Sequence, residues 1–316
     1  MNILVTGIVG FIGFSFAQKL AKKYPKNKII GLDNFDDYYS VRLKKDRSNY
    51  LKKNKNIKII KADITNKNNL KKIFKKYKPK IIFNFAAQAG VRYSLKNPRK
   101  YLDTNINGFF NLCECAKNYN TQKMFYASSS SVYGDTKKFP LKENDKLNPK
   151  NIYGLSKKFN EELAEVYSFN SKVKFIGLRF FTVYGQWGRP DMMMIKYINC
   201  SLKNKNFELY NYGNHVRDFT YIEDVTNILI KMIKKKILRH EIFNICSNNP
   251  KGLKFVLNLI NRYTIKPKIK KKPLQKADIK KTHGSNLKLT KFLNYKKFYS
   301  LNEGIKNTVN WLKNYN

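Results

Sequence analysis

The chain has 316 residues, of which 42% are hydrophobic, and this is enough to bury one large core or two smaller ones. Lys and Arg number 64 against 21 Asp and Glu, so the formal net charge is +43. No apolar run is as long as a membrane-spanning helix, which excludes a helical integral membrane protein.

The positive charge raises the possibility of nucleic-acid binding, because dense lysine neutralises phosphates. The basic residues are 55 Lys and only 9 Arg, and they are spread through every segment together with 39 Asn. A nucleic-acid-binding protein more often gathers Lys and Arg on one element. We therefore interpret the charge as a bias toward lysine on the surface, and predict no specific nucleic-acid partner.

The cysteines have neither metal-ligand nor disulfide-framework spacing, and the three histidines share no metal-like spacing either. Met1 and Asn2 lead straight into the apolar run ILVTG, which leaves no room for a signal peptide. We expect a cytoplasmic protein without a metal site, in which these cysteines are reduced: Cys113, Cys115, Cys200 and Cys246.

Apolar runs of strand length alternate with amphipathic segments of helix length from the first residue onward. Strands are expected at 2–7, 28–33, 56–63, 80–87, 123–129, 173–181 and 241–246, and helices at 69–77, 101–118 and 153–170, with another helix at the C-terminus. Continuous apolar strands that alternate with helices indicate a parallel sheet covered on both faces. The fold class is therefore α/β, a Rossmann-type doubly wound parallel sheet.

The alternation becomes irregular after about Phe181, where loops rich in Gly, Pro, Asn and Tyr begin. We expect residues 1–180 to form a dinucleotide-binding domain, to which a later segment near 215–248 returns. Residues 181–316 are expected to form mainly a smaller α/β substrate-binding domain.

The turn after the first expected strand reads VTGIVGFIG and contains Gly7, Gly10 and Gly13. A tight turn, a close approach of backbone to a pyrophosphate and close helix–strand packing each require a residue without Cβ. The helix that follows presents free N–H groups to phosphates. The spacing is G-x-x-G-x-x-G, and the strand before it and the helix after it are those that a dinucleotide site requires.

Two carboxylates stand at the ends of the next two strands. Asp33 lies 20 residues beyond Gly13, where a carboxylate accepts a hydrogen bond from the ribose 2′-OH and repels a 2′-phosphate, which favours NAD over NADP. Asp63 either bonds the adenine or caps the helix that begins near TNKNNL. The predicted NAD-binding residues are Gly7, Gly10, Phe11, Ile12, Gly13, Asp33, Asn34, Asp63, Ile64, Ala86, Tyr153 and Lys157.

A cluster of hydroxyls, in YASSSSVYG, follows the strand at 123–129, and a Tyr-x-x-x-Lys pattern begins the helix at 153–170. Tyr153 and Lys157 are four apart and so share one helix face. A cationic lysine one turn away should stabilise the phenolate and lower the tyrosine pKa, which suits Tyr153 to take a proton from a sugar hydroxyl. One of the serines can hold the same oxygen.

Arg189 lies in an uncharged aromatic loop, YGQWGRPDMMM, of a chain that elsewhere uses lysine for positive charge. A planar fork of donors is the usual reason that lysine cannot replace arginine. The loop therefore indicates binding of an anion with two oxygens.

Four motifs, TGxxGFIG, ASSSSVYG, YGLSKK and RDFTYIEDV, resemble the extended short-chain dehydrogenase/reductase family of nucleotide-sugar epimerases, dehydratases and decarboxylases. Three further motifs, DNFDDYYSVRLKK, AAQAGVRYS and QWGRPDM, are similar to those of the UDP-glucuronate 4-epimerases. The likeness covers essentially the whole chain. It implies an NAD-dependent homodimer that converts UDP-glucuronate to UDP-galacturonate through a 4-keto sugar.

The resemblance also implies roles for individual residues. Tyr153 would be the general base and acid, Lys157 its partner and a ribose ligand, and Ser129 the hydroxyl that bridges Tyr153 and the sugar O4. The implied substrate-binding residues are Ser129 at O4, Ser130, Ser131, Thr182 and Arg189 around the uronate carboxylate, Arg92 near the sugar acid, Arg217 at the diphosphate, and Asp278 on the uridine side.

The alternatives are other members of the family and two different classes of protein. Dehydratases carry an Asp-Glu pair where this chain has Ser130 and Ser131, and decarboxylases carry a Glu where it has Ser131. An epimerase of neutral UDP-glucose would not need Arg189. A nucleic-acid-associated basic protein and a catalytically inactive NAD sensor remain as alternatives, and the intact Ser129, Tyr153 and Lys157 argue against the second.

Overall fold

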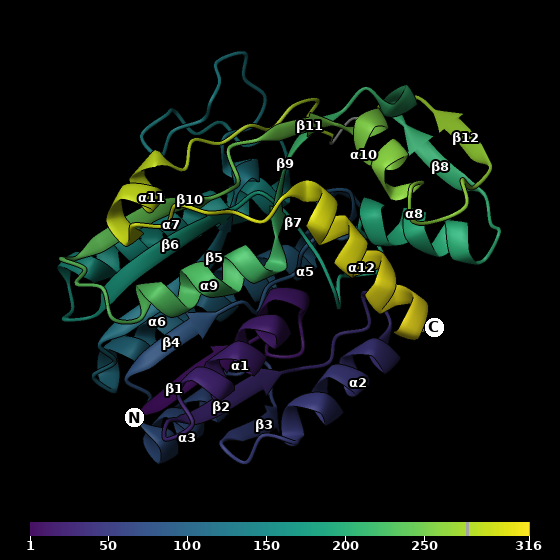
Figure 1. Ribbon diagram of the computed structural model, residues 1–316. Helices are drawn as coiled ribbons and strands as arrows, with labels where there is room; N and C mark the ends of the chain where they lie inside the picture. The colour runs from purple at the N-terminus through teal and green to yellow at the C-terminus, as the bar shows by residue number, and fades with distance from the viewer. Residues whose placement is uncertain (276–277, 316) are drawn as a thin grey trace.

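The computed structural model describes residues 1–275 and 278–315 (Figure 1). Its centre is a seven-stranded sheet in which every pairing is parallel, with the strand order β10-β6-β5-β4-β1-β2-β3. The strands are β1 (Asn2–Thr6), β2 (Lys28–Asp33), β3 (Ile57–Lys61), β4 (Ile81–Asn84), β5 (Lys123–Ser129), β6 (Lys174–Phe180) and β10 (His240–Ile245). The Rossmann-type doubly wound parallel sheet predicted from the sequence is confirmed.

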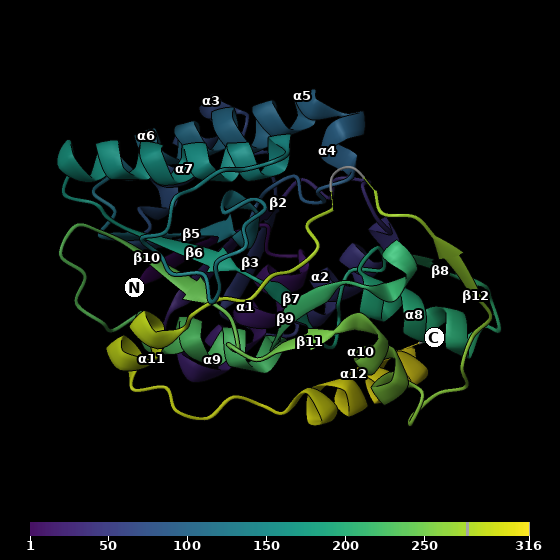
Figure 2. The ribbon, with the colours of Figure 1, turned by 90° about the horizontal axis from the view of Figure 1, so that it is seen from above.

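The strands are apolar throughout because helices cover both faces of the sheet. In β1, Ile3 and Val5 join one buried cluster and Leu4 joins another on the opposite face. Figure 2 shows the two helix layers with the sheet between them. One layer holds α3 (Lys67–Tyr77), α6 (Gly108–Asn118) and α7 (Ile152–Phe169), and the other holds α1 (Phe11–Lys23), α2 (Val41–Lys52), α9 (Ile222–Met232) and α11 (Leu287–Leu293).

The expected helix at 101–118 is divided. Residues Leu102–Asn107 form a π-helical turn, η1, which continues directly into α6. Two short helices precede it, α4 (Tyr93–Lys96) and α5 (Pro98–Tyr101). Wider π-turns of this kind often lie beside functional sites.

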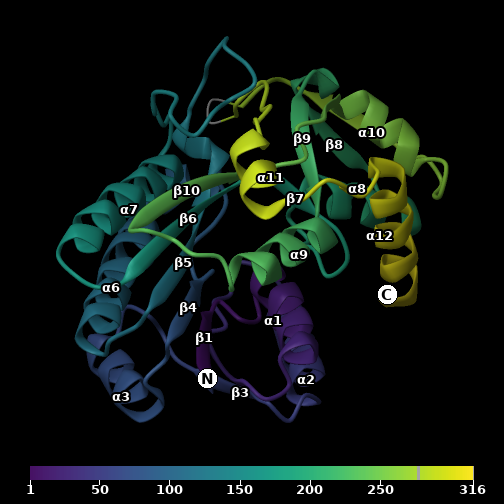
Figure 3. The ribbon, with the colours of Figure 1, turned by 60° about the vertical axis from the view of Figure 1, so that its left-hand side comes forward.

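The smaller region lies beyond the carboxyl ends of the large sheet's strands, and Figure 3 shows its elements gathered on one side of the molecule. It has a three-stranded sheet of order β11-β9-β7 and a two-stranded parallel pair, β12-β8. The elements are β7 (Thr182–Tyr184), α8 (Met193–Leu202), β8 (Phe207–Tyr210), η3 (Asn211–Gly213), β9 (Val216–Tyr221), β11 (Pro250–Gly252), α10 (Leu253–Ile260), β12 (Ile269–Lys272) and α12 (Leu301–Tyr315).

The chain passes between the two regions more than once. From β9 it runs through α9 to β10, which pairs with β6 at the edge of the large sheet. Later still, α11 packs against β10 and α9. Among the described residues, none of the helices combines the length and the apolar character that a membrane span needs.

Candidate active site

The glycine-rich turn between β1 and α1 leaves no space for side chains. Gly7 has φ +65°, and a Cβ added there would lie 2.6 Å from the backbone N of Ala86. A Cβ on Gly13 would lie 2.1 Å from the carbonyl oxygen of Gly7. Gly10 is the N-cap of α1 and offers no side-chain cap, so the first N–H groups of the helix are available to an anion. The turn therefore fits the pyrophosphate of a dinucleotide.

Asp33, the last residue of β2, is fixed beside this turn. Its carboxylate accepts hydrogen bonds from the backbone N–H of Val9 at 3.1 Å and of Phe35 at 2.9 Å. Burial raises the pKa of Asp33, while these hydrogen bonds and the nearby Lys44 oppose that rise. Each oxygen keeps a second lone pair, so the carboxylate can still accept a ribose hydroxyl.

The helix-cap interpretation of Asp63 is wrong. The N-cap of α3 is Asn66, whose side chain accepts a hydrogen bond from the backbone N–H of Asn69. The Asp63 carboxylate instead accepts hydrogen bonds from Thr65 and, at 2.7 Å, from the side-chain amide of Asn34. Asp63 therefore lies just beyond the end of β3 and lines the same cavity as Asp33.

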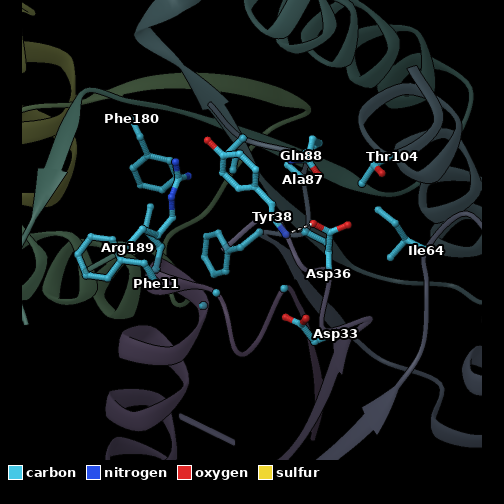
Figure 4. A pocket seen from close by; sticks show the side chains of 18 of the residues that line it. Phe11, Asp33, Asp36, Tyr38, Ile64, Ala87, Gln88, Thr104, Phe180 and Arg189 are labelled. Atoms are coloured by element: carbon cyan, nitrogen blue, oxygen red, sulfur yellow. Dashed lines mark hydrogen bonds between the residues drawn. The ribbon is translucent and has the colours of Figure 1, made fainter. Parts of the chain in front are cut away.

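A first cavity runs from the glycine turn to the carboxyl end of β5 and the beginning of α7 (Figure 4). Figure 4 shows Asp33 below, Ile64 and Thr104 on one side, and Arg189 with Phe180 on the other, with Tyr38 between. The sequence-predicted residues that line this cavity are Gly7, Gly10, Phe11, Ile12, Gly13, Asp33, Asn34, Asp63, Ile64, Ala86, Ser129, Tyr153, Lys157 and Arg189.

Ser129, Tyr153 and Lys157 meet where β5 ends and α7 begins. The start of α7 is fixed by Asn151, whose side chain accepts the backbone N–H of Gly154 at 2.8 Å. The Ser129 hydroxyl is near enough to Tyr153 to lower the pKa of the phenol. The Nζ of Lys157 lies 6.0 Å from the centre of the Tyr153 ring. An oxygen held by both hydroxyls would exchange a proton with the phenol.

The predicted lowering of the Tyr153 pKa is not found in the ligand-free protein. Burial raises the pKa of Tyr153 above its ordinary value of 10, and the nearby Ser129 hydroxyl and the charge of Arg189 only partly offset this. Burial also lowers the pKa of Lys157 to about 8, although the nearby Glu161 opposes the shift. Both groups are pushed toward their neutral forms because each is removed from water.

Arg189 is held by a neighbouring carboxylate. Its Nε and Nη2 donate to the two oxygens of Asp191 at 3.0 and 2.7 Å, and Asp191 also accepts a hydrogen bond from the hydroxyl of Tyr38 at 3.1 Å. The Tyr38 ring lies beside the guanidinium, 5.6 Å away. The fork is thus placed to bind a carboxylate, as the sequence suggested, and the chain itself supplies one.

A second cavity lies between the large sheet and the smaller region, and it shares Phe11, Tyr38 and Met192 with the first. Arg92 crosses it and donates from Nε and Nη2 to the carboxylate of Asp278 at 3.0 and 2.7 Å. Of the sequence-predicted substrate residues, this cavity is lined by Arg92, Thr182, Arg217 and Asp278.

His215 was not predicted from the sequence. It lines the second cavity, is 6% exposed, and its Nε2 has no hydrogen-bond partner in the part of the chain that the structure describes. Burial, together with the charge of Arg217, lowers the pKa of His215 to about 4, although Asp278 opposes the shift. The ring is therefore neutral at physiological pH, and its Nε2 lies 3.6 Å from a carboxylate oxygen of Asp278.

The third and fourth serines of the hydroxyl cluster are placed differently from the first two. Ser130 and Ser131 line neither cavity, as the described residues define the two cavities. They begin a short 3-10 helix, η2 (Ser130–Val132), in which the backbone N–H of Ser131 donates to the Ser129 hydroxyl at 3.1 Å. They lie next to Ser129, which with Ser128 lines the first cavity.

Comparison with known proteins supports a common origin. Residues 3–246 match the model of the NAD dependent epimerase/dehydratase family. A UDP-glucuronate 4-epimerase from Thermodesulfobacterium geofontis is 38% identical over 314 residues, which cover 98% of this chain and 95% of that protein.

Two solved structures share the whole architecture. The UDP-glucuronic acid 4-epimerase from Bacillus cereus, in complex with UDP-glucuronic acid and NAD, matches with a TM-score of 0.94 and 29% identity, over 100% of both chains. The UDP-glucose 4-epimerase from Thermotoga maritima, with UDP-glucose, matches with a TM-score of 0.89 and 28% identity, over 100% of this chain and 99% of the other.

Proposed function

Because this chain belongs to the NAD dependent epimerase/dehydratase family, we propose that it catalyses the NAD-dependent 4-epimerisation of UDP-glucuronate to UDP-galacturonate. The observation that carries the proposal is the placement of an arginine fork, Arg189, in the same cavity as Ser129, Tyr153 and Lys157. In a uronate the carboxylate is attached to C5, next to the reacting C4. A site that acts on O4 while holding two oxygens one carbon away suits that sugar.

The larger region would bind NAD and the smaller region the UDP group, with the sugar at their junction. Support comes from the glycine turn and Asp33 in the first cavity and from Arg92, Arg217 and His215 in the second. When bound in the first cavity, NAD would supply the acceptor and donor of the C4 hydride. Since it regains its starting oxidation state, it acts as a prosthetic group.

Tyr153 would take the proton from O4 as the 4-keto sugar forms and return it when C4 is reduced again. Ser129 would hold O4 against the phenol, and its place beside Tyr153 in the same cavity supports this role. Because burial raises the pKa of Tyr153, a nearby positive charge is needed for it to act as a base at neutral pH. Lys157 is placed to supply that charge while it stays protonated.

Arg189 would also decide what happens to the intermediate. A 4-keto uronate is a β-keto acid, which loses CO₂ when its C5–carboxylate bond aligns with the carbonyl π system. Held by a planar fork, the carboxylate is kept out of that alignment, so that rotation and reduction of the ketone prevail.

Among the alternatives, a UDP-glucose 4-epimerase is supported by the shared fold but not by the site. UDP-glucose has no carboxylate for Arg189 to bind. A decarboxylase would lack its Glu, because Ser131 stands there. An inactive NAD sensor would not need the Ser129–Tyr153 contact. Specific nucleic-acid binding would persist at physiological salt, whereas attraction to the net charge of +43 would be lost as salt rises.

The function is tested by incubating the purified protein with UDP-glucuronate, with and without added NAD, and following the sugar protons by NMR. We expect a mixture of UDP-glucuronate and UDP-galacturonate. Pentose and CO₂ would instead identify a decarboxylase. Turnover of UDP-glucose without turnover of UDP-glucuronate would overturn the assignment of the uronate.

We propose further that the protein is a cytoplasmic homodimer. The four cysteines are all buried and unpaired, which suits a reducing compartment. The outer face of α6 and α7 exposes a set of large apolar side chains that soluble monomers seldom display together: Phe110, Leu155, Phe159, Val166 and Phe169. Two copies of this face would bury one another as a four-helix bundle.

A further inference from the structure

We propose that Asp191 is an internal competitor of the substrate carboxylate: Asp191 is paired with Arg189 and is displaced when a uronate binds. The inference rests on the proposed function, since it needs a substrate with a carboxylate near Arg189. It assigns Asp191 and Tyr38 a role in selecting among UDP-sugars, in addition to the residues that contact the sugar ring.

The geometry of the ion pair is that of a bound ligand. A guanidinium holds a carboxylate best through two parallel N–H···O bonds. Asp191 takes both bonds along the Nε–Nη2 edge of Arg189, at 3.0 and 2.7 Å. A uronate that approaches the same edge must therefore replace Asp191.

Asp191 stays ionised in the empty site. The pKa of its carboxyl is lowered from the ordinary value, because the charge and the hydrogen bonds of Arg189 and the hydroxyl of Tyr38 outweigh the effect of burial. The competition is thus between two carboxylates of the same charge. It is not decided by protonation of the protein's own carboxylate near neutral pH.

The structure leaves space for the Asp191 side chain to move away from Arg189. The Asp191 side chain is 33% exposed, whereas that of Arg189 is 19% exposed, so Asp191 can turn to water while the guanidinium stays at the cavity. Asp191 lines the second cavity and Arg189 the first, so the pair stands at the junction where the sugar would lie.

Tyr38 determines how firmly Asp191 is held. Its hydroxyl donates to Asp191 at 3.1 Å, and burial together with the charge of Asp191 raises the pKa of Tyr38 to about 12, so the proton stays in place. Tyr38 also lies against Gly90, where an added Cβ would be 2.3 Å from the hydroxyl oxygen. A neutral sugar has no carboxylate that could replace Asp191 on Arg189. The Asp191–Arg189 pair therefore remains intact when such a sugar binds.

The test uses NAD-loaded protein with the background substitution Tyr153→Phe, so that the two uronates are not interconverted, and compares by calorimetry the binding of UDP-glucuronate, UDP-galacturonate, UDP-glucose and UDP. For Asp191→Asn we expect the Kd of both uronates to fall by roughly three- to fivefold, since a partly exposed ion pair is worth about 1 kcal/mol at most. The Kd of UDP-glucose and UDP should change by less than about twofold. Asp103→Asn, in the exposed Arg99–Asp103 pair, is the control for the change in net charge.

Simple repulsion between Asp191 and the substrate would produce a similar change in Asp191→Asn, so a variant without a charge change is needed. Tyr38→Phe removes only the hydrogen bond to Asp191, and it should tighten uronate binding by a smaller factor than Asp191→Asn does. A crystal structure of the wild-type complex with UDP-glucuronate should show the Arg189–Asp191 bonds broken, and the complex with UDP should show them intact.

Two results would overturn the inference: weaker uronate binding in Asp191→Asn, or a complex in which Asp191 and the uronate share Arg189. Failure of the proposed function is recognised separately. In that case the wild-type protein itself would neither bind nor convert UDP-glucuronate, whatever the variants do.

Discussion

The Arg179 guanidinium and the Glu161 carboxylate form two parallel hydrogen bonds, from Nε to Oε1 at 2.9 Å and from Nη2 to Oε2 at 2.7 Å. Their side chains are 3% and 4% exposed. Glu161 also accepts the hydroxyl of Ser128 at 2.5 Å. The pair therefore connects β6 and β5 to α7, one residue from Ser129 on β5 and one helical turn from Lys157 on α7.

Breaking this pair should destabilise the protein strongly. In Glu161→Gln the buried guanidinium loses its counter-charge, and we expect the free energy of unfolding to fall by about 3–5 kcal/mol. Urea denaturation measures the change. Glu162→Gln is the matched control, because its pair with Lys158 is exposed and should contribute less than about 1 kcal/mol. Equal effects of the two substitutions would contradict the importance of burial.

Lys157 should reduce stability while it supports activity. Its pKa in the folded protein is about 8, below its ordinary value of 10.5, so the unfolded chain binds more protons between these values and the stability of the wild-type protein rises with pH across that window. Lys157→Met should therefore be inactive, yet more stable at pH 7 by roughly 3 kcal/mol. The advantage should shrink between pH 8 and 10.5, as thermal unfolding would show. A variant less stable than wild type at pH 7 would refute this.

Replacement of Arg189 should change the product. In Arg189→Ala or Arg189→Lys the fork no longer holds the carboxylate, and we expect the share of pentose and CO₂ to rise relative to UDP-galacturonate. NMR of the product mixture gives the ratio directly. Arg99→Lys, at an exposed surface pair, should leave the ratio as in wild type. An unchanged ratio in both Arg189 variants would show that the fork does not protect the intermediate.

His215 should make the ligand-free protein sensitive to acid. Its folded pKa is about 4, below the ordinary 6.5, so stability that is present above pH 6.5 is lost as the pH falls toward 4. Arg217, Arg92 and Asp278 face the ring, and burial together with the two arginines keeps it neutral against the effect of Asp278. Relative to His215→Gln, wild type should lose roughly 3 kcal/mol between pH 7 and 4 in thermal unfolding. Parallel curves for the two proteins would contradict the low pKa.

The exposed face of α6 and α7 should be needed for the dimer. A carboxylate in the centre of an apolar interface is left without a partner, so Val166→Glu should yield monomers in analytical ultracentrifugation. Ile265→Glu is the control, because Ile265 is 82% exposed and lies outside this face. If Val166→Glu remains a dimer, the interface is elsewhere.

The sequence predicted the parts of the fold that depend on short-range patterns. Each of the seven strands of the large sheet begins within one residue of the expected start and ends within three residues of the expected end. The helix at 101–118 was predicted less well, because apolar periodicity does not distinguish the π-turn of η1 from the α-helix that follows.

The candidate site divides in the same way. The glycine turn, Asp33 and the Tyr153–Lys157 pair could be located from spacing, since each depends on neighbours within one turn or one strand end. Tyr38 could not be recognised, because its contact with Asp191 joins residues 153 apart in the chain. Arg92 and Asp278 were each named from the sequence, but their pairing could not be predicted, because they are 186 apart.

By itself, the sequence of this protein determined the order of strands and helices, the residue types at the strand ends and the presence of an arginine fork. Only the tertiary structure decided how deeply those groups are buried and with which groups they are paired. Burial reversed the expected direction of the Tyr153 pKa shift, and the paired Asp191 turned Arg189 from a free anion site into an occupied one. The physical reason is that desolvation and ion pairing depend on distances between elements, which local sequence patterns do not contain.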